Sequence, residues 1–322
     1  MRFIAAILAF FMTLPLSAAS GYAGQTVAGA VKWYTFTPQD KTYNTSTQGN
    51  CTDGKYLYQV LLKIVNNSEY TEIQKIRLSD WKPVLTMHPR KTVKYNGFDI
   101  YHGGDMCYNP DTKEIAVITY SNFTTAAYQL VIIDPETLLP KRRQVVAGVT
   151  KFYAIDYDSA NKRYVTTVEG KTGREFLTFD SSFKKLRQFS VSPAERTCAV
   201  SCDKDYIFCL ENDKRYGKFD RARIHIFTWE GAPVKSVLIP TRGEIEDLFR
   251  VGDDFYAAFV LVGKAFAVDN KHMFVRKIVP SRTQLLRSPP LLPLVSESGA
   301  KRQLDWLYDT GVKLEDWSRQ AW

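Results

Sequence analysis

The sequence predicts an all-β protein built from repeated antiparallel sheets, and three observations lead to that prediction. A unit of about fifty residues recurs along the chain, and each copy opens with a turn rich in Asp, Asn and Gly. An alternating strand follows each turn, and a second strand pair follows that strand. Between residues 24 and 280, no segment of ten residues carries a convincing helical pattern. Four short strands per unit at this period are typical of a β-propeller.

The first signature of the unit is a polar turn that leads into a strand. It occurs in segments 53–58, 109–117, 158–165, 202–208 and 252–256. Successive copies start 59, 49, 42 and 50 residues apart, measured between Tyr56, Ile115, Tyr164, Tyr206 and Tyr256. Because Asp, Asn and Gly in the middle of a tight turn are typical of hairpins, each copy is interpreted as two paired strands.

The second signature is a strand that ends in an acidic or tryptophan-containing turn. It occurs in segments 76–81, 130–137, 176–181 and 224–231, and basic strands follow at 140–146 and 184–191. Sheets arrayed around an axis bury one another's faces, which a single four-stranded sheet cannot do. We therefore predict a β-propeller of five blades, each of four antiparallel strands. The alternatives are six blades and a β-sandwich whose strand spacing is coincidental.

The two ends of the chain differ in character from the repeats. Residues 1–23 have a basic start at Arg2, an apolar run and small residues before Ala23, as in a secretory signal peptide; cleavage after Ala19 is the alternative. Residues 24–280 form the predicted propeller, within which segment 28–37 is an extra strand that can complete the last blade. Residues 281–322 are expected to be a Pro-containing linker and a C-terminal tail, packed on the propeller or extending from it.

Composition and charge restrict the class of protein. The chain has 322 residues, 45% hydrophobic and 24% charged, with a net charge of +9 spread along its length. This excludes collagen-like, coiled-coil, disordered and polytopic membrane classes. No charge run is typical of a nucleic-acid arm, so we expect no nucleic-acid partner. After signal cleavage we expect a secreted or periplasmic monomer without an integral membrane segment.

The cysteines fit an exported protein without fixing a disulfide pattern. Their positions are Cys51, Cys107, Cys198, Cys202 and Cys209. Cys198 with Cys202 or with Cys209 are local candidate pairs, and buried small side chains are the alternative. The spacing lacks a nearby histidine, and phosphate-loop and dinucleotide motifs are absent, so we expect no metal and no cofactor.

Polar residues recur where the innermost strands of the predicted blades begin. Loops that lead into these strands gather at one mouth of a propeller, so the side chains are expected to converge in a pocket. The expected ligand-binding residues are Asn50, His102, Asp105, Tyr153, Asp156, Arg196, Glu244, Glu246 and Asp247.

Several of these residues have chemistry suited to catalysis, and each also has a structural alternative. His102 with Asp105 can serve as a general base and its orienting group. Glu244, Glu246 and Asp247 are close enough in sequence to raise a carboxyl pKa by crowding. Candidate catalytic residues are therefore His102, Asp105, Glu244 and Glu246, although channel-facing polar groups in propellers often only bind water or neighbouring strands.

Three segments resemble exported bacterial β-propeller proteins, many of them uncharacterised. They are segments 48–56, 102–110 and 244–249. The second resembles a His-x-Asn-Asp-Met-x-Tyr-Asn pattern, with Gly104 where Asn is usual. The resemblance covers residues 30–280 and implies a fold rather than an activity, because propellers host unrelated chemistries.

Two functions are compatible with this sequence. The first is an exported binding protein that holds a small polar or glycan ligand, or an extracytoplasmic protein partner, at the central mouth. The second is a carbohydrate-active hydrolase or lyase of the five-bladed type, with Asp105 or Asp156 opposite Glu244 or Glu246. Glycosidases require two carboxyl groups roughly 5–9 Å apart. Binding is favoured because the sequence identifies no acid/base pair.

Overall fold

A computed structural model describes most of the repeated region of the chain. The described residues are 33–35, 44–65, 68–87, 102–120, 129–146, 149, 152–169, 174–190, 197–212, 221–240, 244–262, 268–278 and 282–287. The predicted signal peptide at 1–23, Arg196 and most of the predicted tail lie outside these ranges.

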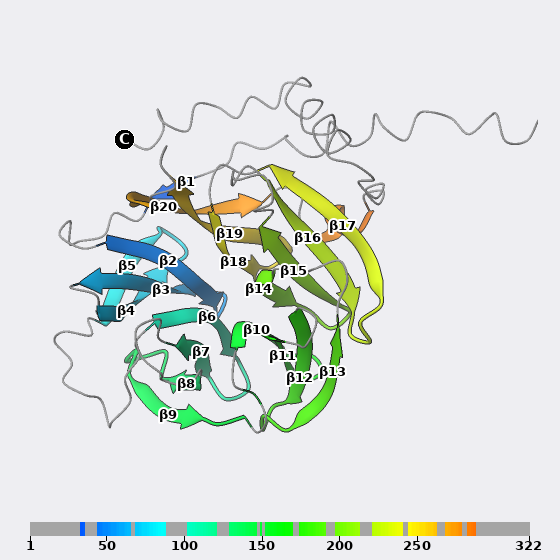
Figure 1. The fold of residues 1–322 in the computed structure, drawn as a ribbon. Helices are drawn as coiled ribbons and strands as arrows, with labels where there is room; N and C mark the ends of the chain where they lie inside the picture. Colours follow the sequence, from blue (N-terminus) through cyan, green and yellow to red (C-terminus); the bar gives the residue numbers. More distant parts are fainter. Residues whose placement is uncertain are drawn as a thin grey trace, which may run out of the picture.

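The described strands form four-stranded antiparallel sheets arranged around a common centre (Figure 1). The first sheet contains β2 (Asn44–Thr52), β3 (Tyr56–Val65), β4 (Ser68–Arg77) and β5 (Lys82–Met87). The second contains β6 (His102–Asn109), β7 (Glu114–Tyr120), β8 (Gln129–Ile133) and β9 (Pro140–Gln144). The third contains β10 (Phe152–Asp158), β11 (Arg163–Glu169), β12 (Arg174–Asp180) and β13 (Lys185–Ser190).

Two further sheets complete the set. One contains β14 (Thr197–Cys202), β15 (Tyr206–Asn212), β16 (Arg221–Thr228) and β17 (Pro233–Pro240). The other contains β18 (Glu244–Val251), β19 (Asp254–Val262), β20 (Val268–Ile278) and β1 (Trp33–Thr35). The N-terminal strand β1 pairs with β20 and is the outermost strand of the last sheet, as predicted for segment 28–37. The all-β propeller fold with four-stranded sheets is confirmed.

The first strand of each repeat lies at the centre of the molecule. Strand β2 contacts β6, β6 contacts β10, β10 contacts β14, β14 contacts β18, and β18 contacts β2 again. Each pair of neighbouring sheets encloses its own buried hydrophobic cluster. Both faces of every described sheet are therefore covered by a neighbour, which is why the strands carry apolar residues on both sides.

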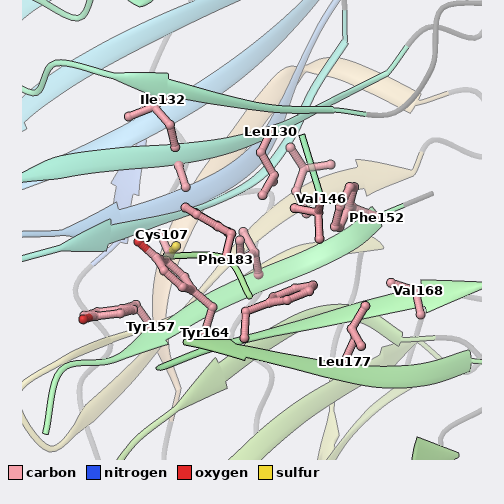
Figure 2. Packing of buried hydrophobic residues seen from close by; sticks show 14 residues of the cluster. Cys107, Leu130, Ile132, Val146, Phe152, Tyr157, Tyr164, Val168, Leu177 and Phe183 are labelled. Carbon is pink, nitrogen blue, oxygen red and sulfur yellow. The ribbon is translucent and has the colours of Figure 1, made fainter. Parts of the chain in front are cut away.

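Figure 2 shows one of these cores, between the β6–β9 sheet and the β10–β13 sheet. Leu130 and Ile132 of β8 face aromatic side chains of the third sheet. The rings of Tyr164 and Phe183 stack with their centroids 4.5 Å apart and their planes 18° apart. Burial of each such side chain stabilises the fold by about 1.5–3 kcal/mol, so the blades are held mainly by apolar contacts between sheets.

The predicted polar turns close four of the five inner hairpins. Asp53, Asn109, Asp158 and Asp203 each accept two backbone N–H groups through one side-chain oxygen. Such Asx turns mimic a backbone turn and fix the chain reversal. Gly54 and Gly252 have φ angles of +89° and +64°, which suit glycine in these hairpins.

A short helix, α2 (Arg282–Arg287), lies where the predicted linker begins. Its Arg282 N–H donates to the Asp253 carbonyl at 2.8 Å, and the Thr283 hydroxyl lies 3.0 Å from Asp253 Oδ1. Leu286 packs against the cluster between the last two sheets. Residues 282–287 are therefore helical and packed on the propeller, and the predicted proline-containing part of the linker lies outside the described residues.

The cysteine side chains correct one sequence-based expectation. Cys51, Cys107, Cys202 and Cys209 are free and buried. The candidate disulfides of Cys198 with Cys202 or with Cys209 are therefore wrong, because Cys202 and Cys209 are both free thiols within the sheets. None of the described helices is long and apolar enough to cross a membrane.

Candidate functional site

Each innermost strand contains a register shift near its amino-terminal half. The shifts lie between Thr47 and Asn50, Gly103 and Met106, Phe152 and Ala154, Thr197 and Ala199, and Ile245 and Asp247. A β-bulge inserts an unpaired residue and changes the direction in which a side chain points. Asp105, Tyr153 and Glu246 lie within these bulges, so their orientation differs from that of a regular strand.

Two of the predicted aspartates join neighbouring blades from inside the fold. Asp105 accepts the Met106 and Ile155 N–H groups, each at 2.8 Å. Asp247 accepts the Leu248 and Asn50 N–H groups at 2.6 and 2.5 Å. In both cases one oxygen stays on its own strand and the other reaches the inner strand of the next blade. The two side chains are 4% and 1% exposed, so their first role is to link strands.

The buried Asp105 and Asp247 carboxyl groups also interact with each other. Burial raises the pKa of Asp247 to about 7 and raises the pKa of Asp105 well above its usual value. Two buried carboxyl groups in contact cannot both ionise without mutual repulsion, so the pair retains a proton. The expected rise in an acidic pKa is thus present, but its main cause is burial rather than crowding by Glu244 and Glu246.

The close approach of the two aspartates depends on Gly49, in the strand between them. A Cβ atom at Gly49 would lie 2.5 Å from Asp105 Cα and 2.6 Å from the Gly104 oxygen and Met106 nitrogen. These neighbours are backbone atoms, which cannot rotate away. The absence of a side chain at Gly49 therefore allows β2 to lie directly against β6.

A cavity of about 250 Å³ occupies the centre of the fold, at the carboxyl ends of the innermost strands. All five innermost strands or their hairpins contribute to its wall. The lining residues are Asn50, Cys51, Thr52, Asp53, Met106, Tyr108, Pro110, Ile155, Asp156, Tyr157, Ser159, Val200, Ser201, Cys202, Leu248, Phe249 and Arg250. This central pocket is slightly smaller than the range of about 300–1,000 Å³ usual for drug-sized ligands.

Asp156 supplies a carboxylate to the wall of the central pocket. Its Oδ1 accepts the Tyr157 N–H at 2.8 Å, and its Oδ2 accepts the Cys202 N–H at 2.6 Å and the Ser201 hydroxyl at 3.2 Å. Burial raises the pKa of Asp156, whereas these hydrogen bonds and the charge of Arg250 act in the opposite direction. The bond to Cys202 links β10 to β14, so Asp156 combines a structural role with a place in the pocket.

Arg250 supplies the positive charge of the central pocket. Its Nη1 lies 2.9 Å from Asp203 Oδ2, and Arg282 of α2 hydrogen-bonds the same oxygen. Arg282 also reaches Asp205 at 3.1 Å. Burial acts to raise the pKa of Asp203, but the hydrogen bond and charge of Arg282, with the backbone N–H groups of Asp205 and Tyr206, hold it below its usual value.

Two aromatic side chains give the pocket apolar faces. Tyr108 stacks on Tyr58 with ring centroids 6.3 Å apart, and Phe249 stacks on Tyr256 with centroids 5.6 Å apart. Each of the two rings thus packs against another aromatic ring. The pocket can hold a small molecule with both polar edges and an apolar surface.

The predicted ligand-binding residues fall into separate groups. Asn50 and Asp156 line the central pocket. His102, Asp105 and Asp247 are buried and are not among the lining residues. Tyr153 and Glu246 are half-buried nearer the amino-terminal ends of the strands, Glu244 begins β18, and Arg196 lies outside the described residues. The role of this second group in ligand binding stays a prediction.

The Asp105 carboxyl group was expected to orient the His102 ring, and the structure gives the two side chains other partners. Its Nε2 lies 3.3 Å from Gln48 Oε1, while both Asp105 oxygens accept backbone N–H groups. Sequence reasoning missed Tyr108, Ser201 and Arg250, which line the pocket from the opposite ends of the inner strands. Their position immediately before the polar hairpin turns is the signal that could have identified them.

Among the described residues, no cluster of three or more His, Cys, Asp or Glu side chains has a geometry suited to a metal ion.

The central pocket and the ring of sheets define a β-propeller protein, and comparisons with known proteins add no narrower class. No protein-family model and no curated protein matches the chain. A tail fiber of Staphylococcus aureus phage P68 is similar with a TM-score of 0.52 and 11% identity, over 84% of this chain and 58% of that chain. At this identity, the similarity concerns the fold alone.

Other similar structures are β-propeller proteins of different activity. The β-propeller domain of the trilobed protease from Pyrococcus furiosus has 13% identity and a TM-score of 0.38, over 76% of this chain and 72% of that chain. A gluconolactonase from Xanthomonas campestris has 10% identity and a TM-score of 0.44, over 81% and 93%. The order of strands in the sheets therefore carries the fold assignment.

Proposed function

We propose that this chain is an exported binding protein that holds a small polar ligand in the central pocket. The single observation that carries the proposal is the convergence of all five innermost strands on one cavity of about 250 Å³. Asn50, Asp156, Ser201 and Arg250 bring polar groups from four different blades to its wall. Concave sites with a few fixed polar groups and aromatic faces are typical of small-molecule binding.

The wider proposal includes the compartment and the architecture. Residues 1–23 act as a secretory signal, and the mature chain is a secreted or periplasmic monomer. The propeller has five blades, which is supported by the closed succession of contacts from β2 through β18 and back to β2.

Carbohydrate hydrolysis is the alternative, and the carboxyl geometry gives it less support. Glycosidases keep their two carboxyl groups roughly 5–9 Å apart so that a sugar bond or water fits between them. Both oxygens of Asp105, one of the candidate catalytic carboxyl groups, accept backbone N–H groups, and Asp105 is not among the residues that line the central pocket. A catalytic pair formed by Asp105 or Asp156 with Glu244 or Glu246 belongs to the hydrolase proposal.

A ligand-stabilisation screen tests the proposed function. Thermal unfolding of the purified protein is measured with neutral sugars, amino acids and divalent ions, for the wild type and for Arg250→Lys and Arg187→Lys. Arg187 lies exposed on the outer strand β13 and provides the same chemical change away from the pocket. A melting-temperature rise that Arg250→Lys reduces and Arg187→Lys preserves supports the proposal. No shift with any class refutes it.

Two further variants separate the central pocket from the sequence-predicted mouth. A ligand shift that is lost in Glu246→Gln but retained in Arg250→Lys would place the ligand at the amino-terminal ends of the inner strands instead. Hydrolysis of an added oligosaccharide, lost in the same Glu246→Gln variant, would favour the hydrolase.

A further inference from the structure

Outside the central pocket, three side chains of the β14–β17 sheet form a hydrogen-bonded chain. Glu211 Oε2 lies 2.8 Å from His225 Nε2. The other ring nitrogen, His225 Nδ1, lies 2.6 Å from Ser236 Oγ. A carboxylate, an imidazole and a hydroxyl in this order are the groups that activate a serine as a nucleophile. These three residues do not line the central pocket, so they form a separate site.

Neighbouring strands place the three groups on one face of the sheet. Glu211 lies on β15, His225 on β16 and Ser236 on β17. His225 is directly opposite Ser236 on one side and directly opposite Cys209 on the other. Glu211 is two positions beyond Cys209, and residues two apart on a strand point to the same face. The chain of groups is therefore built on regular strands, which position side chains more precisely than loops do.

The contacts determine which nitrogen of the neutral His225 ring carries the proton. A carboxylate only accepts hydrogen bonds, so the Nε2–H donates to Glu211. Nδ1 then has a free lone pair, and the Ser236 hydroxyl donates to it. In the serine-protease triad the two nitrogens have the opposite roles. Either nitrogen can accept a proton, so Nδ1 is in position to act as a general base towards Ser236.

The exposure of the three side chains increases from the acid and the base to the hydroxyl. Glu211 and His225 are 8% and 1% exposed, whereas Ser236 is half-buried on the outermost strand of its sheet. The His225 ring also packs beside Phe227, with ring centroids 6.4 Å apart. The base and its partner are therefore shielded from water, while the residue that carries the hydroxyl reaches the surface.

The outer edge of β17 provides hydrogen-bond donors for a carbonyl oxygen. Among the described strands, none pairs with this edge, because β17 is the last strand of its sheet. The N–H groups of an antiparallel strand alternate between the partner strand and the opposite edge. Either Ser236 or the residues on both sides of it therefore direct an N–H to the outer edge. Backbone N–H groups next to a nucleophile stabilise the oxyanion that forms when it adds to an ester.

We propose that Ser236 is the nucleophile of an ester-cleaving site, with His225 as its general base and Glu211 as the residue that positions His225. Ser236 Oγ adds to the ester carbonyl carbon while His225 Nδ1 takes the hydroxyl proton. The bond between the carbonyl carbon and the alcohol oxygen breaks, the alcohol leaves with that proton, and the acyl group stays on Ser236. His225 then takes a proton from water, and the resulting hydroxide releases the acid while the proton returns to Ser236 Oγ.

The substrate class is a small ester that can approach the outer strand of the sheet. This inference is independent of the proposed function, because the central pocket contributes none of its groups.

Reaction with a fluorophosphonate tests the nucleophile in the unmodified full chain. This reagent transfers its phosphonyl group to an activated serine oxygen and releases fluoride, and peptide mass spectrometry gives the rate at each serine. Ser190 is the internal control, because it lies exposed on the outermost strand β13, opposite Glu175 rather than a histidine. Ser236 is expected to react about 100-fold faster than Ser190. Equal rates, or no product at Ser236, would overturn the inference.

Hydrolysis of p-nitrophenyl acetate tests ester cleavage itself. The wild type is expected to release p-nitrophenol, Ser236→Ala is expected to lose this release, and the matched Ser190→Ala is expected to keep it. Both substitutions remove only a hydroxyl from an outermost strand. Release that continues unchanged in Ser236→Ala would show that Ser236 is not the nucleophile.

Two variants test the base and its positioning residue. His225→Ala is expected to abolish the fluorophosphonate reaction, and added imidazole is expected to restore it, which a purely structural histidine would not allow. Glu211→Gln is expected to slow the reaction about tenfold or more, with Ser236 still the labelled residue; an unchanged rate would exclude Glu211 from the site. If His225→Ala lowers the melting temperature, the wild-type comparison of Ser236 with Ser190 still decides the inference.

Discussion

The buried carboxyl pair makes stability depend on pH in a direction opposite to that of ordinary surface carboxylates. The folded-state pKa of Asp247 is raised from 3.8 to about 7. Below pH 3.8 the contribution of Asp247 to the free energy of unfolding is fully present, and this contribution is lost as the pH rises from about 4 to about 7. A rise of roughly three pKa units corresponds to about 4 kcal/mol of stability at most. Asp105, whose pKa is also raised, acts in the same direction.

Asp247→Asn tests this reasoning. The amide does not titrate, and its N–H can donate to Asp105, which removes the shared proton. Urea unfolding at intervals from pH 4.5 to 7.5 is expected to show the wild type losing about 2–4 kcal/mol across that range. The variant is expected to lose less than half as much. Equal slopes for the two proteins would show that the pair does not hold a proton, and the reasoning would be refuted.

Three further predictions concern other parts of the fold. Gly49→Ala is expected to destabilise the protein by about 3 kcal/mol or more, because its Cβ meets only backbone atoms of β6 at 2.5–2.6 Å. Urea unfolding measures this loss of stability. The control is Gly54→Ala, whose Cβ meets nothing within 4 Å and which is expected to cost only about 1 kcal/mol. Tyr164→Phe is expected to cost about 1–3 kcal/mol, because Asn109 Nδ2 loses its 2.7 Å bond to the Tyr164 hydroxyl, and an unchanged denaturation midpoint would argue against that bond. Glu114 pairs with Arg142 and Lys141, which hold its pKa at about 2. Its contribution to the free energy of unfolding is therefore present above pH 4.5 and lost on acidification towards pH 2. In an acid titration, Glu114→Gln is expected to lose less stability than the wild type.

The repeated strand pattern allowed the fold to be predicted, because it depends on local features that each repeat carries in full. Polar turns at Asp53, Asn109, Asp158 and Asp203 identify the inner hairpins without knowledge of their neighbours. The extra strand in segment 28–37 was recognisable because a propeller needs its last sheet completed.

The candidate site was harder to predict, because it depends on register between strands. The Asp105 and Asp247 side chains accept backbone N–H groups of neighbouring blades and are not among the residues that line the central pocket. No pattern within one repeat distinguishes a pocket aspartate such as Asp156 from a linking aspartate such as Asp105. The polar pattern predicted a site at the starts of the inner strands, whereas the central pocket lies at their carboxyl ends.

The hydrogen bond from Asn50 N–H to Asp247 joins two residues 197 positions apart in the chain. A polypeptide is synthesised with its amino terminus first, so β2 is complete long before β18 exists. The first blade therefore stays incomplete, with the Asn50 N–H lacking its Asp247 partner, until the last blade forms. Contacts of such long sequence separation slow folding, so the central ring of strands closes only after nearly the whole propeller region has been synthesised.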